Sequence, residues 1–408
     1  MKRDTEASSA NARSHRFVRT SLLLGLVGML ALLVAACGGD DPTATPVPPQ
    51  ATETPDAAAI FQAEWDALLA AAQAEGEIVT FIAGSLGRSD LRNLLPRFEE
   101  KYKINVLFST GSSRQNADKT LAERAGGRFE LDIWMGGSGT ANTRLLPANA
   151  LRPIEPLLIH PEVLDRSVWL DGRFHWLDAD TQQFLFAFAA NASKSDITYN
   201  TDLVDPNDIQ SLQDLLDPKY KGLIIMRDPR LAGVGAVVLD YWANPDVGEE
   251  FLRRLLTEMD VTIANDARQA AEQLALGKYA ICLFACRNEV LKAKEDGLPV
   301  EGDFPHYTRE GGRLSSGSGT LFLMERPKNP NAQKFFANWW LSREGQEMMQ
   351  EASGNDSIRL DITKDTVAPG SRRQEGINYT WSESRPTYTA DLIASAAFAT
   401  EVLASVGK

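Results

Sequence analysis

Short apolar segments alternate with helical patterns between residues 77 and 136, and this alternation restricts the possible folds more than any other feature of the chain. The predicted strands are 77–83, 104–108 and 131–135. The segment from Ser89 has apolar residues at helical spacing up to Tyr102, and 116–125 is also predicted to be helical. Strands joined by helices at this spacing are parallel, because a parallel connection needs a crossover of a dozen or more residues. The pattern therefore predicts an α/β domain.

Each of these three strands is followed by a turn of small polar residues. The turns lie around Ser85, Ser112 and Ser138. In an open α/β sheet, ligands bind outside the carboxyl ends of the strands, so the three turns are expected to converge on one crevice. The same residue types also suit ordinary turns, and each turn taken alone fits that interpretation better; only the three together raise binding to an equal alternative.

A second α/β unit is predicted further along the chain. It contains strands at 184–190, 197–200, 223–226 and 279–284, and helices at 247–259 and 267–276. A return strand at 321–324 then leads to helices at 331–341 and 343–352.

The N-terminal residues have the composition of an export signal. Five basic residues precede an uncharged apolar stretch from Ser21 to Ala36, which is short for a membrane-spanning helix. The stretch ends in Val34–Gly38, which resembles a bacterial lipobox, in which Cys37 accepts a lipid. We therefore predict a lipoprotein signal peptide at 1–36 and a lipid-anchored Pro/Thr-rich linker at 37–56, with an uncleaved N-terminal anchor as the alternative. Either arrangement exports the rest of the chain, and the first holds it at the outer face of the cytoplasmic membrane.

Charge and cysteine content exclude some classes of protein. The chain has a net charge of −13, and without the five basic and two acidic residues of 1–36 it retains 37 basic and 53 acidic residues, a net of −16. An acidic chain without a basic block is a poor nucleic-acid binder. Cys282 and Cys286 are the cysteines that remain besides Cys37, so a disulfide scaffold is excluded. A local bridge between them is possible, but a free, buried Cys282 is the favoured expectation.

Enzyme chemistry finds little support in the sequence. The four histidines are scattered and form no zinc-binding pattern. The segment 136–140 (GGSGT) lacks the last glycine of a nucleophile elbow, and no phosphate-binding glycine loop is present. We expect no enzyme activity, no cofactor and no metal ligand.

Four segments carry a resemblance to a known family. They are Trp65–Val79 (WDALLAAAQAEGEIV), Ile197–Gly222 (ITYNTDLV … LQDLLDPKYKG), Ala270–Leu283 (AAEQLALGKYAICL) and Pro327–Met349 (PKNPNAQKFFANWWLSREGQEMM). In this order and spacing they resemble the extracellular solute-binding proteins of ATP-driven importers, in the subgroup that includes ferric-ion, thiamine and phosphonate binders.

The resemblance implies a two-lobed periplasmic-binding-protein fold of type II, with the ligand in a cleft between the lobes. The first lobe would be formed by 57–195 and 311–408, and the second by 196–310. Such a protein would act as a monomer, close its lobes over a small solute, and deliver the solute to a membrane permease.

Positions in this fold select the candidate ligand-binding residues. They are Ser85, Arg88, Ser112, Ser113, Arg114, Ser138, Tyr199, Arg227, Asp266, Cys286 and Arg287. Serine hydroxyls and main-chain N–H groups favour an oxyanion, and Arg114 or Arg227 would supply a planar fork to it. The predicted solute is therefore an anion. The alternative for each arginine is a surface ion pair in an acidic protein.

Other functions stay open at this point. Ferric-ion binders of the family use two adjacent tyrosines, but the matching position here reads Leu283–Cys286 (LFAC), which disfavours iron without excluding another metal site. A surface sensor or adhesion module without a transport role is the alternative of a different class. The role of residues 361–408 is also open, since Gly376–Thr387 either caps the cleft or packs on the first lobe.

Overall fold

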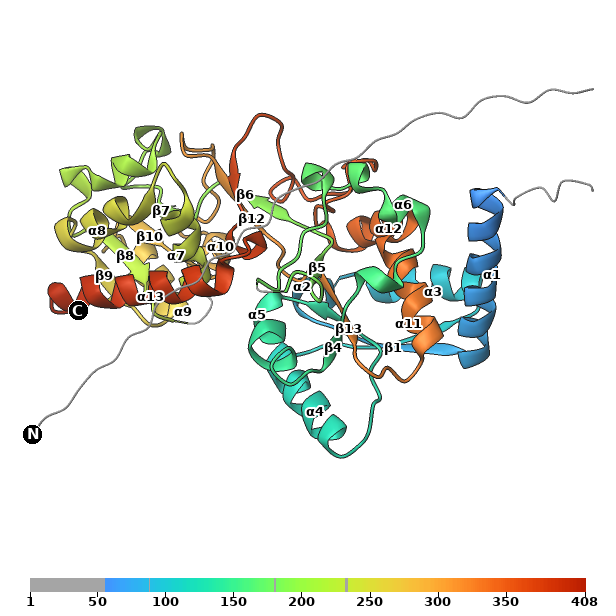
Figure 1. The fold of residues 1–408 in the computed structure, drawn as a ribbon. Helices are drawn as coiled ribbons and strands as arrows, with labels where there is room; N and C mark the ends of the chain where they lie inside the picture. Colours follow the sequence, from blue (N-terminus) through green and yellow to red (C-terminus); the bar gives the residue numbers. More distant parts are fainter. Residues whose placement is uncertain (1–55, 88, 180, 232–233) are drawn as a thin grey trace, which may run out of the picture. The chain divides into compact units, whose positions relative to one another are not determined.

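The computed structural model describes residues 56–408 except 88, 180, 232 and 233. Residues Pro55–Lys408 form one compact unit (Figure 1). The predicted signal peptide and lipidation site, and the predicted linker up to residue 55, lie outside the described residues. Within the described part of the chain, no helix has the length and apolar content needed to cross a membrane.

The first lobe is built on a sheet whose central strands are parallel, as predicted. Its order is β2-β1-β3-β13-β4, and β5 also pairs with β13. The first three strands run parallel to one another, whereas β13 is antiparallel to its neighbours β3, β4 and β5. The strands are β1 (Glu77–Ile82), β2 (Asn105–Ser109), β3 (Ile133–Gly136), β4 (Leu151–Arg152), β5 (Phe186–Ala187) and β13 (Thr320–Met324).

Helices from both ends of the chain belong to the first lobe. They are α1 (Ala57–Glu75), α2 (Gly84–Gly87), α3 (Leu91–Tyr102), α4 (Ser113–Ala125), α5 (Ser138–Thr140) with the π-helical turn η1 (Ala141–Leu145), α6 (Pro161–Leu164), α11 (Pro330–Leu341) and α12 (Arg343–Ser353). Helix α11 is buried around most of its circumference, as its aromatic content requires, and contributes Trp339 and Trp340 to the core. Helix α3 begins after Asp90, one residue later than the N-cap expected at Ser89, whose hydroxyl instead donates to the Leu86 carbonyl.

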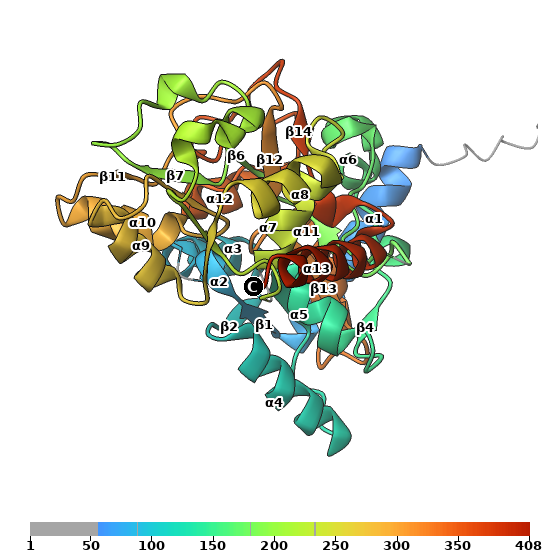
Figure 2. The same cartoon turned by 90° about the vertical axis from the view of Figure 1, so that its left-hand side faces the viewer.

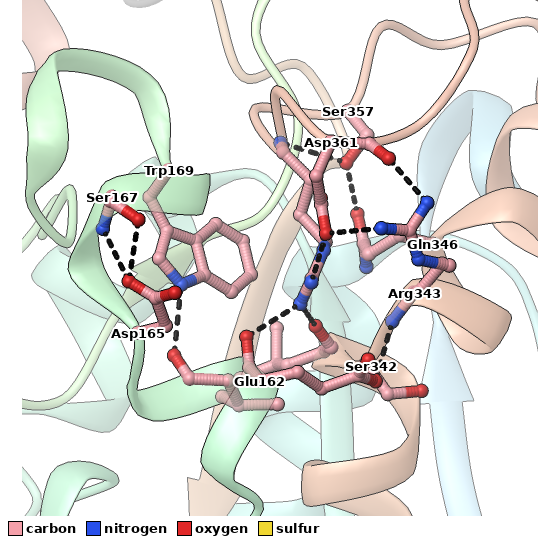
Figure 3. Close-up of polar contacts among 12 residues, drawn as sticks. Glu162, Asp165, Ser167, Trp169, Ser342, Arg343, Gln346, Ser357 and Asp361 are labelled. Carbon is pink, nitrogen blue, oxygen red and sulfur yellow. Dashed lines mark hydrogen bonds and ion pairs between the residues drawn. The ribbon is translucent and has the colours of Figure 1, made fainter.

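A buried arginine connects α6, the end of α11 and the segment after α12 through hydrogen bonds. Figure 3 shows its partners Glu162 and Asp361 on two of these segments. Arg359 is fully buried, and its guanidinium makes two hydrogen bonds to the carboxylate of Asp361, at 2.9 and 2.8 Å. It also donates to the carbonyls of Leu341 and Glu162, at 3.0 and 3.1 Å. A buried cation is tolerable here because a paired carboxylate and carbonyl acceptors replace its hydration.

The second lobe has its own sheet and core. The strand order is β11-β7-β10-β8-β9, in which β8, β9 and β10 are parallel and β7 is antiparallel to β10. The strands are β7 (Ile197–Asn200), β8 (Ile224–Arg227), β9 (Thr262–Ala264), β10 (Ile281–Leu283) and β11 (Val300–Glu301). The helices are α7 (Val234–Ala243), α8 (Gly248–Glu258), α9 (Ala267–Ala275) and α10 (Arg287–Glu295). Sequence periodicity predicted α8 and α9 but missed α7 and α10.

Three segments that cross between the lobes form a third, small sheet. It consists of β6 (Asn191–Ser193), β12 (Gly312–Ser315) and β14 (Tyr379–Thr380), with β12 in the middle. Short 3-10 turns connect the larger elements: η2 (Glu155–Leu157), η3 (Arg166–Val168), η4 (Leu170–Gly172), η5 (Pro206–Asp208), η6 (Leu212–Leu216), η7 (Pro218–Tyr220) and η8 (Ser382–Ser384). Of the strand predicted at 184–190, only Phe186–Ala187 forms, although the buried residues Leu185–Ala190 explain its apolar composition.

The C-terminal helix α13 (Tyr388–Ser405) packs on the second lobe, beside α7 and α8 (Figures 1 and 2). Its residues Phe398, Val402 and Leu403 belong to the second-lobe core. The expected boundaries placed the whole of 311–408 with the first lobe. The chain does return there through β13, α11 and α12, but it crosses again after β14 because α13 has apolar residues that fit the second-lobe helices.

The two remaining cysteines form a disulfide bond. The expectation of a free Cys282 is therefore corrected, although Cys282 is buried in β10 as predicted. Cys286 is also buried, directly before α10, so the bond closes the loop that follows β10.

Candidate functional site

A cleft of about 1230 Å³ lies between the two lobes. The first-lobe wall comes from the start of α4 and from the segment after β3: Arg114, Gly137, Ser138, Gly139, Thr140, Thr143 and Arg144. The second-lobe wall comes from the segment after β8, the start of α7 and the C-terminal helix: Pro229, Arg230, Leu231, Gly235, Ala236, Val237, Tyr388, Leu392 and Ala396. The crossing segments add Arg313, Ser315 and Glu383.

Close backbone packing shapes the cleft on the first-lobe side. A side chain at Gly137 would meet the carbonyl of Gly317 at 3.1 Å, and one at Gly84 would meet the hydroxyl of Ser318 at 2.4 Å. Gly84 also has a positive φ of 63°, which favours glycine. The turns after β1 and β3 therefore lie directly against the turn between β12 and β13, and Ser138 and Ser315 line the cleft beside this contact.

Arg114 and Ser138 are the two predicted binding residues that line the cleft. Ser138 is buried, at 4% exposure, and directly follows β3 and Gly137. Arg114 is exposed in the first turn of α4, and among the described residues its guanidinium has no hydrogen-bond or ion-pair partner. Ser138 follows β3 and Arg114 lies shortly after β2, so both positions are at the carboxyl ends of parallel strands of the first-lobe sheet.

The other three arginines that line the cleft are each paired with carboxylates. Arg144 pairs with Asp118, and Arg230 makes two hydrogen bonds of 2.8 Å to Asp228. The hydrogen bond from Arg230 lowers the pKa of Asp228 below its ordinary value. These two charges are therefore compensated locally, whereas Arg114 has no such partner in the described part of the chain.

Arg313 pairs with two carboxylates at the crossing between the lobes. Its guanidinium lies 2.6 Å from a carboxylate oxygen of Asp240 on α7 and 3.2 Å from one of Asp196. Burial raises the pKa of Asp240 to about 6, against the opposing effect of Arg313. The triad joins the central crossing strand β12 to the second lobe.

Glu383 and Tyr388 were not among the predicted residues, yet both line the cleft. The carboxylate of Glu383 accepts hydrogen bonds from the backbone N–H and hydroxyl of Ser316, at 3.0 and 2.8 Å. Burial raises the pKa of Tyr388 above its ordinary value. The only signal in the sequence was the aromatic and polar segment Gly376–Thr387, for which capping of the cleft was one of two alternatives.

Ser112 and Ser113 do not line the cleft. Ser112 caps α4, its hydroxyl accepting from the Gln115 N–H at 3.4 Å, and Ser113 is the first residue of that helix. Ser85 lies in α2, and Arg88 lies outside the described residues. The serine after β2 therefore caps a helix, which agrees with the alternative that these serines belong to ordinary turns.

The five candidates of the second lobe also lie away from the cleft lining, and each is engaged locally. Tyr199 pairs with Ile281 at the start of β10, and its ring packs against Phe304 at 5.8 Å. Because β7 is antiparallel to β10, its end lies at the opposite edge of the sheet from the loop after β10.

Each of the other four candidates forms a contact within the second lobe. Asp266 caps α9 by accepting from the Gln269 N–H at 2.9 Å, and Arg287 pairs with Asp303 at 2.5 Å. Cys286 is held in the disulfide. Arg227 makes one long contact, 3.5 Å, to the carbonyl of Asn265.

No group of three or more His, Cys, Asp or Glu side chains suited to a metal ion occurs among the described residues. The loop after β10, where two tyrosines would be needed for iron of the family type, instead contains Phe284 and Ala285, both with positive φ.

Comparisons with known proteins agree with this geometry. Residues 93–368 match the model of a family described as bacterial extracellular solute-binding protein. An uncharacterised protein of Haemophilus influenzae is 22% identical over 280 residues, which is 65% of this chain and 73% of that protein.

Two solved structures show the same fold. The Trichodesmium protein IdiA (FutA), in complex with iron and citrate ligands, is 16% identical, with a TM-score of 0.57 and coverage of 80% of this chain and 99% of that chain. The periplasmic binding protein AfuA of Actinobacillus pleuropneumoniae, with fructose-6-phosphate bound, is 18% identical, with a TM-score of 0.50 and coverage of 78% and 97%. At these identities the likeness establishes the two-lobed α/β fold alone.

Proposed function

This chain belongs to the bacterial extracellular solute-binding proteins, which serve ATP-driven importers, and from that premise we propose that it captures a small anionic solute in the cleft between its lobes. The solute is then delivered to the importer's permease. Arg114 and Ser138 are the residues of the predicted set that contact it.

The guanidinium of Arg114, which has no partner among the described residues, is the observation that carries the proposal. The chain as a whole is acidic, with a net charge of −13, yet the described residues lining the cleft include four arginines and one glutamate. A planar guanidinium without a carboxylate partner is suited to a carboxylate or phosphate, to which it donates two parallel hydrogen bonds. The bound citrate and fructose-6-phosphate of the two similar structures are anions of these kinds, which supports the proposal.

The crossing sheet supplies the means of closure. Three short strands connect the lobes, and hinge closure needs only a few residues at such connections to change their backbone angles. Closure would bring the second-lobe wall towards Arg114 and remove the solute from water. A monomer suits this movement, since the solute is enclosed by the two lobes of one chain.

We also propose that a lipid on Cys37 holds the protein at the outer face of the cytoplasmic membrane. The support is in the sequence, where small residues precede Cys37 and a Pro/Thr-rich linker follows it. Cys37→Ser should release the protein from the membrane fraction and abolish incorporation of a labelled fatty acid. Retention in the membrane without label would instead identify an uncleaved N-terminal anchor.

Iron is the second candidate, favoured by the iron in the similar IdiA (FutA) structure. The described residues offer no cluster of metal ligands, so iron would have to bind together with an organic anion that Arg114 holds. Ferric citrate tests this form of the proposal.

A thermal-shift screen of the Pro55–Lys408 unit tests the proposed function. The panel contains small carboxylates, phosphate, phosphonates, polyamines, sugars, thiamine and ferric citrate. A ligand at a hundred times its Kd adds about 2.7 kcal/mol to the free energy of unfolding. Stabilisation by one class of anion is the expected result. Stabilisation by polyamines or neutral sugars alone would contradict the anion proposal, and no stabilisation by any compound would favour a sensor or adhesion module without transport.

A further inference from the structure

Helix α13 contributes one face to the cleft. Tyr388, Leu392 and Ala396 all line it, and their spacing of four residues places them on the same side of the helix. The family match ends at residue 368, so this face lies beyond the matched part of the chain.

The helix is anchored, so its face is a permanent part of the wall. Phe398, Val402 and Leu403 lie in the second-lobe core, and the Lys408 ammonium donates to the Val261 carbonyl at 2.6 Å. At the other end, Tyr388 is buried in a cluster with Ala179 of the first lobe and Leu239 of the second.

The α13 face continues into an apolar surface on the second lobe. A Cβ atom at Gly235 would lie 3.6 Å from a terminal methyl group of Leu392, so the two helices are in contact there. Leu231 and Val237 of the second lobe also line the cleft. A second cavity of about 560 Å³ also borders Tyr388 and Leu392, which leaves further room beside this surface.

The distribution of charge across the cleft is uneven. On the second-lobe wall Arg230 is neutralised by Asp228, whereas Arg114 on the first-lobe wall has no partner among the described residues. One wall therefore presents an uncompensated cation and the other presents aliphatic and aromatic side chains.

We propose that the solute is an amphiphilic anion, with a carboxylate or phosphate at Arg114 and an aliphatic or aromatic group against Leu392 and its neighbours. This inference rests on the proposed function and narrows its substrate class. A small inorganic anion would leave the apolar surface of the second-lobe wall in contact with water when the lobes close, whereas an apolar group on the solute would cover it.

Matched pairs of ligands test the inference by titration calorimetry on the Pro55–Lys408 unit. The pairs are acetate with hexanoate, and phosphate with hexyl phosphate, while hexanol and hexylamine carry the same chain without an anion. Each methylene that becomes fully buried raises affinity about fourfold. Hexanoate or hexyl phosphate, whichever belongs to the preferred pair, should therefore bind at least about tenfold more tightly than acetate or phosphate. The preferred pair identifies the head group.

Two variants on α13 distinguish contact between the ligand's apolar chain and this wall from non-specific hydrophobic binding elsewhere. Leu392→Ser should reduce the ratio of affinities within the preferred pair about tenfold, since it removes the central apolar side chain of the face. Ile393→Ser is the matched control, because the neighbouring Ile393 is 67% exposed and does not line the cleft. It should leave the ratio unchanged.

The outcomes separate this inference from the function on which it rests. Equal affinity for parent and hexyl anions, with binding of both, would overturn the amphiphilic solute and leave the anion proposal intact. Binding of hexanol or hexylamine as tight as that of hexanoate would overturn the requirement for an anion. If no anion in either pair binds or stabilises the protein, the proposed function fails together with the inference.

Discussion

The two walls of the cleft are built in different ways. Both walls include a segment that follows a parallel strand, β3 in the first lobe and β8 in the second. The first-lobe wall adds the start of α4, whereas the second-lobe wall adds the start of α7 and the distant helix α13. In the first lobe, two of the candidate residues, Arg114 and Ser138, line the cleft. In the second lobe, none of the five predicted residues lines the cleft.

The difference shows that a position at the carboxyl end of a strand does not by itself make a side chain part of the binding site. Parallel strands bring their carboxyl ends to one edge of a sheet, but the side chains at that edge face the ligand only if the local backbone does not use them. In the second lobe the polar groups at these ends cap α9, pair with Asp303 or form the disulfide. The second-lobe wall comes instead from the segment after β8, the start of α7 and a helix that begins nearly two hundred residues after the lobe does.

The largest expected effect concerns Arg313, which joins the crossing strand to the second lobe. Arg313→Met would leave Asp196 and Asp240 without their cation, and the free energy of unfolding should fall by about 3–5 kcal/mol. Urea denaturation measures the change. Arg287→Ala, which breaks an exposed ion pair with Asp303, is the control and should cost less than about 1 kcal/mol. Equal losses in both variants would show that the triad has no special role in connecting the lobes.

The next largest effect is a loss of stability at acidic pH, caused by His175 beside Trp381. His175 is buried, stacks on Trp381 at a centroid distance of 4.7 Å, and burial lowers its pKa from 6.5 to about 4. Since the unfolded chain takes up the proton more readily, the stability that this histidine provides is complete above pH 6.5 and is lost as the pH falls towards 4. The loss should reach about 3 kcal/mol.

The measurement is the free energy of unfolding at several pH values between 7 and 4, for the wild type and for His175→Phe. Phenylalanine keeps an aromatic ring beside Trp381 but does not titrate. Asp240, whose raised pKa gives the opposite pH dependence, is common to both proteins and cancels in the comparison. Parallel curves for the two proteins would contradict the assignment of the acid-sensitive contact to His175.

The sequence predicted more of the fold than of the site, and particular residues show why. The strands at 77–83 and 223–226 and the helices at 267–276 and 331–341 follow from periodicity, which depends on neighbouring residues alone. Helix α13 was missed because its apolar residues lie on more than one side, with Ile393 exposed and Phe398 buried. The cleft residues Arg230, Arg313 and Glu383 owe their positions to contacts between distant segments, which no local pattern records.

A direct test of the difference between the walls is the affinity for the anion found in the thermal-shift screen. Arg114→Ala should weaken binding by about 2–3 kcal/mol, the usual scale for a hydrogen bond to a charged group. Arg227→Ala is the second-lobe counterpart, and it should leave the affinity unchanged because Arg227 contacts Asn265 and does not line the cleft. The reverse result would mean that closure brings a different set of side chains to the solute.

The smallest effect expected is that of the Cys282–Cys286 disulfide. It closes a loop of about five residues, so the double variant Cys282→Ala/Cys286→Ala should lose about 2 kcal/mol of unfolding free energy. Because the second-lobe wall is formed by the segment after β8 and by α13, the same variant should bind the solute with unchanged affinity in a calorimetric titration. A loss of affinity as large as that of Arg114→Ala would place the loop after β10 in the closed site. In that case the carboxyl end of β10, besides that of β8, would contribute to the site. The second-lobe wall would then resemble the first-lobe wall more closely when the lobes are closed.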